Sequence, residues 1–130
     1  MSEEFKLEIV NPEKSFLNKE DVSEVVVPAF EGEMGILKDH ISLITFLRPG
    51  LITVKGGESK KYFVEEGMVE VSGNNLLILT STVKIIDALE ASYIEKSIKK
   101  AEENLSNSDV SDKDRYFLSY KIETLKELRK

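Results

Sequence analysis

Hydrophobic and polar residues alternate in short segments over about the first 88 residues of the chain. Phe5, Leu7 and Ile9 alternate with Lys6 and Glu8, which is the period of a strand with one buried face. Further short β-branched or aliphatic segments that predict strands are 25–27, 41–47, 51–54, 62–64, 68–71, 76–79 and 83–86. Gly56-Gly57 and residues 72–75 suit hairpin turns between antiparallel neighbours. This spacing predicts a sandwich or barrel.

The hydrophobic period changes from two to about 3.6 after Ile86. A first amphipathic helix carries its apolar stripe on Ile94, Ile98, Ala101 and Leu105. Residues 106–109 break it, and Ser111 with Asp114 three positions later provides a helix start. The second stripe is Leu118, Ile122, Leu125 and Leu128, with Tyr116, Phe117 and Tyr120 beside it. Both stripes are narrow, so we expect an antiparallel hairpin that is docked by only a few kcal/mol.

Together these patterns predict an α+β protein that is mainly β. Residues 1–87 are expected to form a β-sandwich domain, and residues 88–130 an antiparallel two-helix hairpin. The chain has 130 residues and 41% hydrophobic composition, which suits one modest core with an appendage.

Charge and composition narrow the function classes. The formal net charge is −6, and all of the acidic excess lies in the sandwich segment. An acidic surface repels phosphate, so we expect no nucleic-acid partner and no direct lipid binding. The chain has no cysteine, which excludes disulfides and Cys-ligated zinc. The acidic start and the short apolar run 41–47 predict no signal peptide and no membrane insertion, and therefore a soluble chain.

Candidate chemistry is sparse. His40 is the single histidine, so a metal site is not expected. Asp39 and His40 are adjacent and would point to opposite faces of a strand, so we favour a structural or interfacial role over catalysis. The acidic, glycine-containing segment 31–35 lacks the Lys-Ser or Lys-Thr of a phosphate loop and reads as a turn. Its acidity favours contact with a partner, and no catalytic residue is assigned.

One continuous stretch carries a family resemblance. Residues 28–37 read Pro-Ala-Phe-Glu-Gly-Glu-Met-Gly-Ile-Leu and are followed by His40, Leu43, Leu47, Pro49 and Gly50. With residues 67–71, residues 75–79 and the two-helix tail, the sequence resembles the epsilon subunit of bacterial F-type ATP synthase. Glu66 and Met68 replace a glycine and a phenylalanine of that family, and Ser42 replaces a proline.

The resemblance implies a ten-stranded β-sandwich that packs on the gamma subunit and rests on the ring of c subunits. Glu31, Gly32, Glu33 and Met34 occupy the family's contact with the c ring, and His40 is assigned to a subunit interface. The hairpin either lies on the sandwich or extends towards the alpha and beta subunits and blocks ATP hydrolysis. The chain would be a non-catalytic rotor subunit of a proton- or sodium-driven synthase, peripheral on the cytoplasmic face of the bacterial inner membrane.

Some members of that family bind ATP through a motif that contains an arginine before its last alanine. By local similarity the motif falls on residues 86–91, with Ile86, Asp87 and Ala91 retained and Glu90 in place of arginine. Counted back from residues 101–103 it falls on residues 89–94, and Tyr93 replaces the arginine. Both registers lack the cation, so we expect no cofactor. The alternative is a subunit whose compact hairpin still senses ATP.

Overall fold

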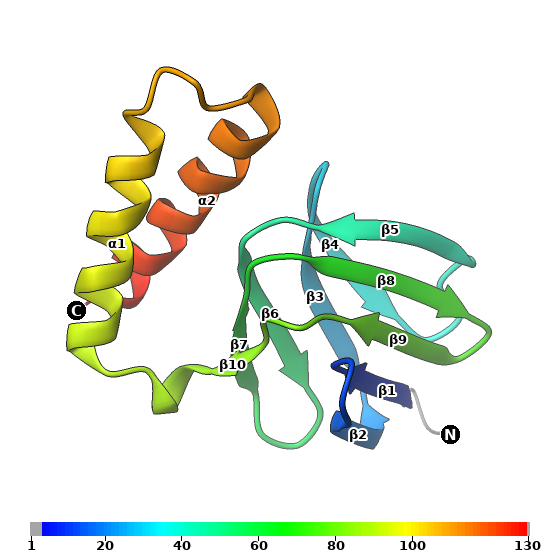
Figure 1. Ribbon diagram of the computed structural model, residues 1–130. Coiled ribbons are helices and arrows are strands. Elements are labelled where there is room, and N and C mark those ends of the chain that lie inside the picture. Colours follow the sequence, from blue (N-terminus) through cyan, green and yellow to red (C-terminus); the bar gives the residue numbers. More distant parts are fainter. Residues whose placement is uncertain (1–3, 130) are drawn as a thin grey trace.

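A computed structural model describes residues 4–129 and places ten strands before two long helices (Figure 1). The strands are β1 (Phe5–Val10), β2 (Ser15–Val22), β3 (Glu24–Ala29), β4 (Gly32–Leu37), β5 (Leu43–Leu47), β6 (Gly50–Lys55), β7 (Lys60–Val64), β8 (Gly67–Ser72), β9 (Asn75–Leu79) and β10 (Lys84–Ile85). A 3₁₀ helix (Ile86–Ala88) then leads to α1 (Ala91–Leu105) and α2 (Asp112–Leu128). The expected fold class and the ten strands are confirmed.

The strands form two layers that share one connection. Their order is β10-β7-β6-β3-β5-β8-β9-β1-β2, with β4 paired to the other side of β3. β3 meets β5 through the single pair Ala29 and Leu47, so the sheet folds over at this point. In Figure 1 the strands β5, β8 and β9 run across the direction of β3, β6 and β7. The two layers make the sandwich.

The predicted hairpins are present at β6–β7 and β8–β9. Consecutive strands are also antiparallel neighbours at β1–β2 and β3–β4. The expectation is wrong for β5, which pairs with the distant β8, and β1 has a second, parallel neighbour in β9. The hydrophobic pattern also did not mark β2, an edge strand with the charged run Lys19, Glu20 and Asp21. The final predicted strand is shorter than residues 83–86, because Ile86 begins the 3₁₀ helix.

The main core lies between the two layers. Its buried members come from all strands but β10, and include Leu7, Ile9, Val25, Val27, Ile36, Leu47, Ile52, Val64, Val69 and Ile78. Inward residues alternate with outward residues along each strand, as the period of two requires. The sandwich core contains no residue of α1 or α2.

A second, smaller core joins the hairpin to the sandwich. Phe63 on β7 is directly opposite Leu51 on β6, and both point away from the main core. They pack against Ile94 and Ile98 of α1 and Leu125 of α2. The layer made by β6 and β7 is therefore covered on both faces.

The helix assignments follow the sequence closely. The side chain of Ser111 accepts a hydrogen bond from the backbone N–H of Asp114 at 3.1 Å, as its N-cap position predicts. Ile94, Ile98 and Ala101 are buried on α1, and Ile122 and Leu125 on α2. The two helices run antiparallel along one side of the sandwich (Figure 1). Within residues 4–129, no helix is long and apolar enough to cross a membrane.

Candidate functional site

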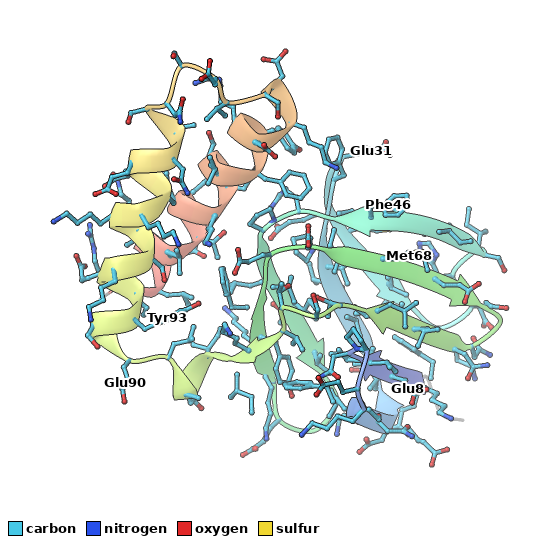
Figure 2. All side chains as sticks on the ribbon, viewed as in Figure 1. Glu8, Glu31, Phe46, Met68, Glu90 and Tyr93 are labelled. Atoms are coloured by element: carbon cyan, nitrogen blue, oxygen red, sulfur yellow. The ribbon has the colours of Figure 1, made fainter. Side chains whose placement is uncertain are left out.

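The β3–β4 connection presents an acidic tip, which we define as Phe30, Glu31, Gly32 and Glu33. Glu31 and Glu33 are exposed, and Figure 2 shows Glu31 at the end of the β3–β4 hairpin beside the start of α2. Gly32 has φ of 138°, a conformation that residues with a Cβ rarely adopt. The tip holds two carboxylates in water at an extremity of the sandwich, where a basic partner surface can reach both.

The expectation of a loop over residues 31–35 is wrong, because β4 begins at Gly32. Ile36 is buried, and Met34 is half-buried and packs against the main core. Gly35 therefore lies in a strand and not in a turn. The two glycines carry no side chain to display the alternation, which hid this strand from the hydrophobic pattern.

A second candidate surface lies on the outside of the other layer. Phe46, Met68 and Leu79 occupy directly opposite positions on β5, β8 and β9, so they share one face. Ile44 continues this outer apolar face, where Ile44 is 61%, Phe46 62% and Leu79 37% exposed. Figure 2 shows Phe46 and Met68 on adjacent strands of this layer. Single exposed apolar residues are common on protein surfaces, but these four residues form one contiguous cluster. Such a cluster suits contact with a protein partner.

Carboxylates border the outer apolar face. Glu70 lies opposite Ile44, and Glu8 lies beyond Leu77 of β9 on β1. The same side of the molecule also has a groove of about 840 Å³ between the sandwich and α2. Its lining includes Phe30, Glu31, Phe46, Leu79, Lys113 and Phe117. The face and the acidic tip are thus adjacent parts of one surface.

Sequence reasoning missed the outer apolar face. The signal was present in β5, which reads Leu-Ile-Thr-Phe-Leu and is apolar on both of its faces. A strand with two apolar faces is typical of one that is covered on both sides. Only one of these sides is covered by residues that the structure describes.

The hairpin meets the tip through aromatic side chains. The Tyr116 hydroxyl donates a hydrogen bond to the backbone carbonyl of Phe30, and the two ring centroids are 4.7 Å apart. The ring centroids of Phe117 and Phe30 are 5.9 Å apart, and those of Tyr120 and Tyr116 are 4.9 Å apart. Burial raises the pKa of the Tyr116 hydroxyl and Tyr120 adds to this effect, while Arg48 opposes it.

Arg48 is a buried cation at the end of β5. The residue is 8% exposed, and its guanidinium carbon lies 3.7 Å from the centre of the Tyr120 ring. One terminal nitrogen donates to the Pro49 carbonyl at 3.0 Å, whereas Nε has no hydrogen-bond partner among the described residues 4–129. The face of an aromatic ring attracts a cation, so Tyr120 provides part of the stabilisation that water would give.

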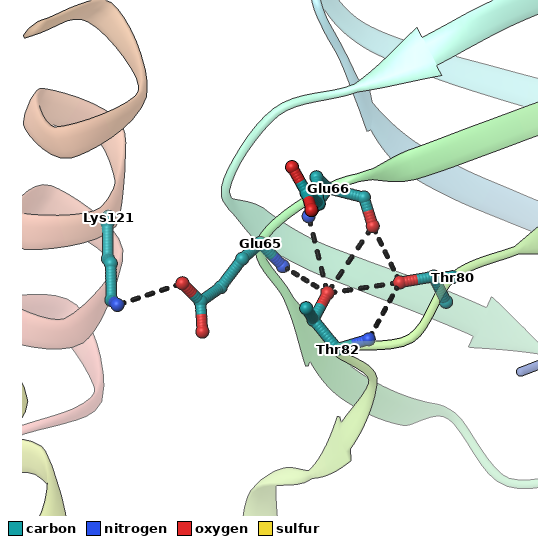
Figure 3. A network of polar contacts seen from close by, with 5 residues as sticks. All are labelled: Glu65, Glu66, Thr80, Thr82 and Lys121. Atoms are coloured by element: carbon teal, nitrogen blue, oxygen red, sulfur yellow. Dashed lines mark hydrogen bonds and ion pairs between the residues drawn. The ribbon is translucent and has the colours of Figure 1, made fainter. Parts of the chain in front are cut away.

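An ion pair adds a polar contact between hairpin and sandwich (Figure 3). Lys121 Nζ lies 2.8 Å from Glu65 Oε1. The loop that carries Glu65 is held by the Thr82 hydroxyl, which accepts from Glu65 N–H at 3.0 Å, and by the Thr80 hydroxyl, which donates to the Glu66 carbonyl at 2.6 Å. A partly exposed ion pair contributes about 1 kcal/mol or less to the free energy of docking. This pair therefore orients the docked hairpin more than it stabilises it.

The residues of the degenerate nucleotide motif lie at the join between the two parts. Ile86 and Asp87 belong to the 3₁₀ helix, Glu90 is the N-cap of α1, and Ala91 begins that helix. Tyr93 is partly exposed, with Lys84 Nζ 5.8 Å from its ring centre. Figure 2 shows Glu90 and Tyr93 at the start of α1, near this join. The five motif positions supply two carboxylates and no cation.

The cleft between the hairpin and the sandwich is also acidic. It measures about 500 Å³, and its charged lining residues are Glu65, Glu66, Asp109, Asp114 and Lys121. Lys121 is already paired with Glu65. Four carboxylates against one lysine repel a phosphate chain.

His40 lies in the loop before β5, so the expectation that it belongs to a strand with Asp39 is wrong. Its backbone N–H donates to the Leu37 carbonyl at 3.2 Å, and its ring Nδ1 lies 2.8 Å from the Ile41 carbonyl oxygen. The neighbouring Asp39 has a positive φ of 66°, and its N–H donates to the Asn74 side chain. Within residues 4–129, no three His, Asp or Glu side chains gather as a metal site.

The sequence and the fold were compared with known proteins. The family model of the ATP synthase delta/epsilon chain beta-sandwich domain matches residues 4–85. The ATP synthase epsilon chain of Pelagibacter ubique is 58% identical over 98% of this chain and 99% of its own length. The epsilon chain of Parvibaculum lavamentivorans is 34% identical over 99% and 98%.

Two solved structures share the fold. A chain of the Euglena gracilis mitochondrial ATP synthase aligns with a TM-score of 0.78 at 20% identity, covering 98% of this chain and 81% of that one. A chain from the central stalk and c ring of the Tetrahymena thermophila mitochondrial ATP synthase aligns with a TM-score of 0.64 at 12% identity, covering 99% and 98%.

Proposed function

The chain belongs to the ATP synthase delta/epsilon chain family, and on that premise we propose that it is a non-catalytic rotor subunit of a proton- or sodium-driven F-type ATP synthase. The sandwich, residues 1–87, links the gamma subunit to the ring of c subunits. The hairpin, residues 88–130, restrains ATP hydrolysis by the alpha and beta subunits when it extends. The subunit is peripheral on the cytoplasmic face of the bacterial inner membrane.

The observation that carries this proposal is the pairing of two different exposed surfaces on one rigid sandwich. The outer apolar face of Ile44, Phe46, Met68 and Leu79 suits a lasting contact with an apolar partner, which we assign to gamma. The acidic tip suits the basic polar loops of the c ring, with Glu31 and Glu33 as the charged contacts and with Gly32 and Met34 of β4 completing the contact. His40 lies close to β5 and is assigned to the edge of the same interface.

The experiment compares two variants of the full chain, each of which is the control for the other. Glu31→Lys with Glu33→Lys should weaken binding to purified c ring by more than about tenfold and leave gamma binding unchanged, because reversed charges repel a basic surface. Phe46→Ser should weaken gamma binding by more than about tenfold and spare the c ring, because the contact with gamma loses its aromatic anchor.

Binding is measured by surface plasmon resonance on each partner, with circular dichroism to confirm that both variants fold. All three positions are exposed, so the fold should be retained. If both variants keep full affinity for both partners, the assignment of the two surfaces is wrong.

A further inference from the structure

The docked hairpin contacts the sandwich at a particular place, the base of the acidic tip. The Tyr116 hydroxyl donates to the carbonyl of Phe30, the residue that immediately precedes Glu31. The N–H of Phe30 donates to the Phe46 carbonyl at 2.8 Å. The peptide groups on both sides of Phe30 are therefore fixed, one by β5 and the other by α2. Only the second of these bonds is lost when the hairpin leaves.

Arg48 ties the same part of α2 to the sandwich. The N–H of Arg48 donates to the Pro28 carbonyl at 2.9 Å, which places its backbone beside the end of β3. Its guanidinium lies against the Tyr120 ring, one helical turn from Tyr116. Within residues 4–129, Arg48 forms no ion pair with a carboxylate. The groups that face this buried charge are therefore uncharged, and they include the Tyr120 ring and the Pro49 carbonyl.

A buried cation with an unpaired Nε gains hydration when the hairpin undocks. The same step costs the cation–π contact and the Tyr116 hydrogen bond. Because these effects oppose each other, the contact is specific in position but small in net free energy. Such a balance is what an element that exchanges between two positions requires.

We propose that Phe30, Arg48, Tyr116 and Tyr120 form a latch that links docking of the hairpin to the conformation of the acidic tip. While the latch is closed, α2 holds the peptide group between Phe30 and Glu31. A partner that binds the tip and shifts this peptide group opens the latch, and an open latch in turn changes the affinity of the tip for that partner. The two effects are equal in size because linkage between binding equilibria is reciprocal.

One part of this proposal rests on the proposed function, namely that the partner of the acidic tip is the c ring. The existence of the latch is tested in the full chain alone. The chain has no cysteine, so Ser72→Cys and Glu127→Cys, both at exposed positions, give unique sites for spin labels on the sandwich and on α2. The distance between the labels reports the docked fraction, and hydrogen exchange reports the amides of Glu31 and Gly32.

Tyr116→Phe removes the hydroxyl and keeps the ring. We expect the docking equilibrium constant to fall about fivefold, the effect of losing one hydrogen bond, and exchange at Glu31 and Gly32 to quicken in parallel. Tyr120→Leu, which removes the face opposite Arg48, should act in the same direction. Ser119→Ala is the matched control, because its hydroxyl donates to the Arg115 carbonyl within α2 and not to the sandwich. An unchanged docked fraction in Tyr116→Phe, or a loss equal to that of Ser119→Ala, overturns the latch.

Adding purified c ring to the labelled chain tests the linkage. We expect c ring to lower the docked fraction of the wild type by more than that of Tyr116→Phe. If c ring binds and the docked fractions of both proteins stay the same, the linkage is refuted although the c-ring contact stands. If c ring does not bind at all, the proposed partner is wrong, and the latch is still decided by the measurement on the chain alone.

Discussion

Gly67 begins β8 at a point where the neighbouring strand comes very close. A Cβ atom built on it would lie 2.6 Å from the Leu79 carbonyl oxygen and 2.9 Å from Thr80 Cβ. Both neighbours belong to a segment that is fixed by its own hydrogen bonds, including that from the Thr80 hydroxyl to Glu66. Neither can retreat without disturbing the pairing of β8 with β9.

Gly67→Ala should therefore lower the free energy of unfolding by about 1 to 3 kcal/mol, the usual cost of forcing an atom into filled space. Urea denaturation followed by circular dichroism measures this change. Gly35→Ala is the matched control, because its Cβ would lie 3.2 Å from the flexible carboxylate of Glu24. Equal losses in the two variants would mean that the close approach at Gly67 is not what requires glycine.

Individual residues differ in how far the sequence could predict them. The exposure of Glu31 and Glu33 followed from their charge, and Glu66, which replaces a family glycine, has no positive φ. The position of Arg48 could not be predicted, because its contact with Tyr120 joins residues far apart in sequence and depends on how α2 lies on the sandwich. A solvated arginine is the usual expectation, and tertiary packing overrides it here.

Among the elements, the two helices were the easiest to predict. Their stripes, the break at 106–109 and the Ser111 cap all depend on neighbours within one or two turns, and the structure contains each of them. The strands β2 and β4 were harder. Charges on an edge strand and glycines within a strand remove the alternating signal while backbone pairing with β1 and β3 remains. Pairing between distant strands, such as β1 with β9, leaves no local pattern at all.

The acidic cleft between the hairpin and the sandwich, and the segment that connects these two parts, predict that the chain does not bind nucleotides. We expect millimolar ATP to produce no heat in calorimetric titration of the full chain and no shift in its melting temperature, because the cleft has four carboxylates and its lysine is paired. Titration with sodium sulfate at matched ionic strength controls for general salt effects. A saturable heat with ATP alone would restore the nucleotide-sensing alternative.

At the scale of the whole molecule, the main core does not depend on the hairpin, because its members all come from the strands and the segments that join them. Truncation after Asp87 should leave a folded sandwich that still assembles with gamma and the c ring. The hydrolysis rate of the assembled synthase should rise, since the restraining element is absent. The rate is measured by phosphate release from membranes that contain either form.

The control for this truncation is the fold of the shortened chain. Loss of the hairpin uncovers Leu51 and Phe63, so the melting temperature and the oligomeric state of the truncated protein are measured in parallel. An unchanged hydrolysis rate in a well-folded, assembled truncation would remove the inhibitory role and leave the linking role intact.

The short β10 strand has a further consequence for the kinetics of the hairpin. β10 pairs with β7 at only Lys84 and Ile85, so residues 84–90 act as a tether that reaches at most about 25 Å when extended. A detached hairpin on so short a tether sees its docking surface at an effective concentration of roughly millimolar or more. It therefore returns quickly unless another surface captures it. The lifetime of the extended state is then set by the strength of that capture and not by the rate at which the hairpin leaves the sandwich.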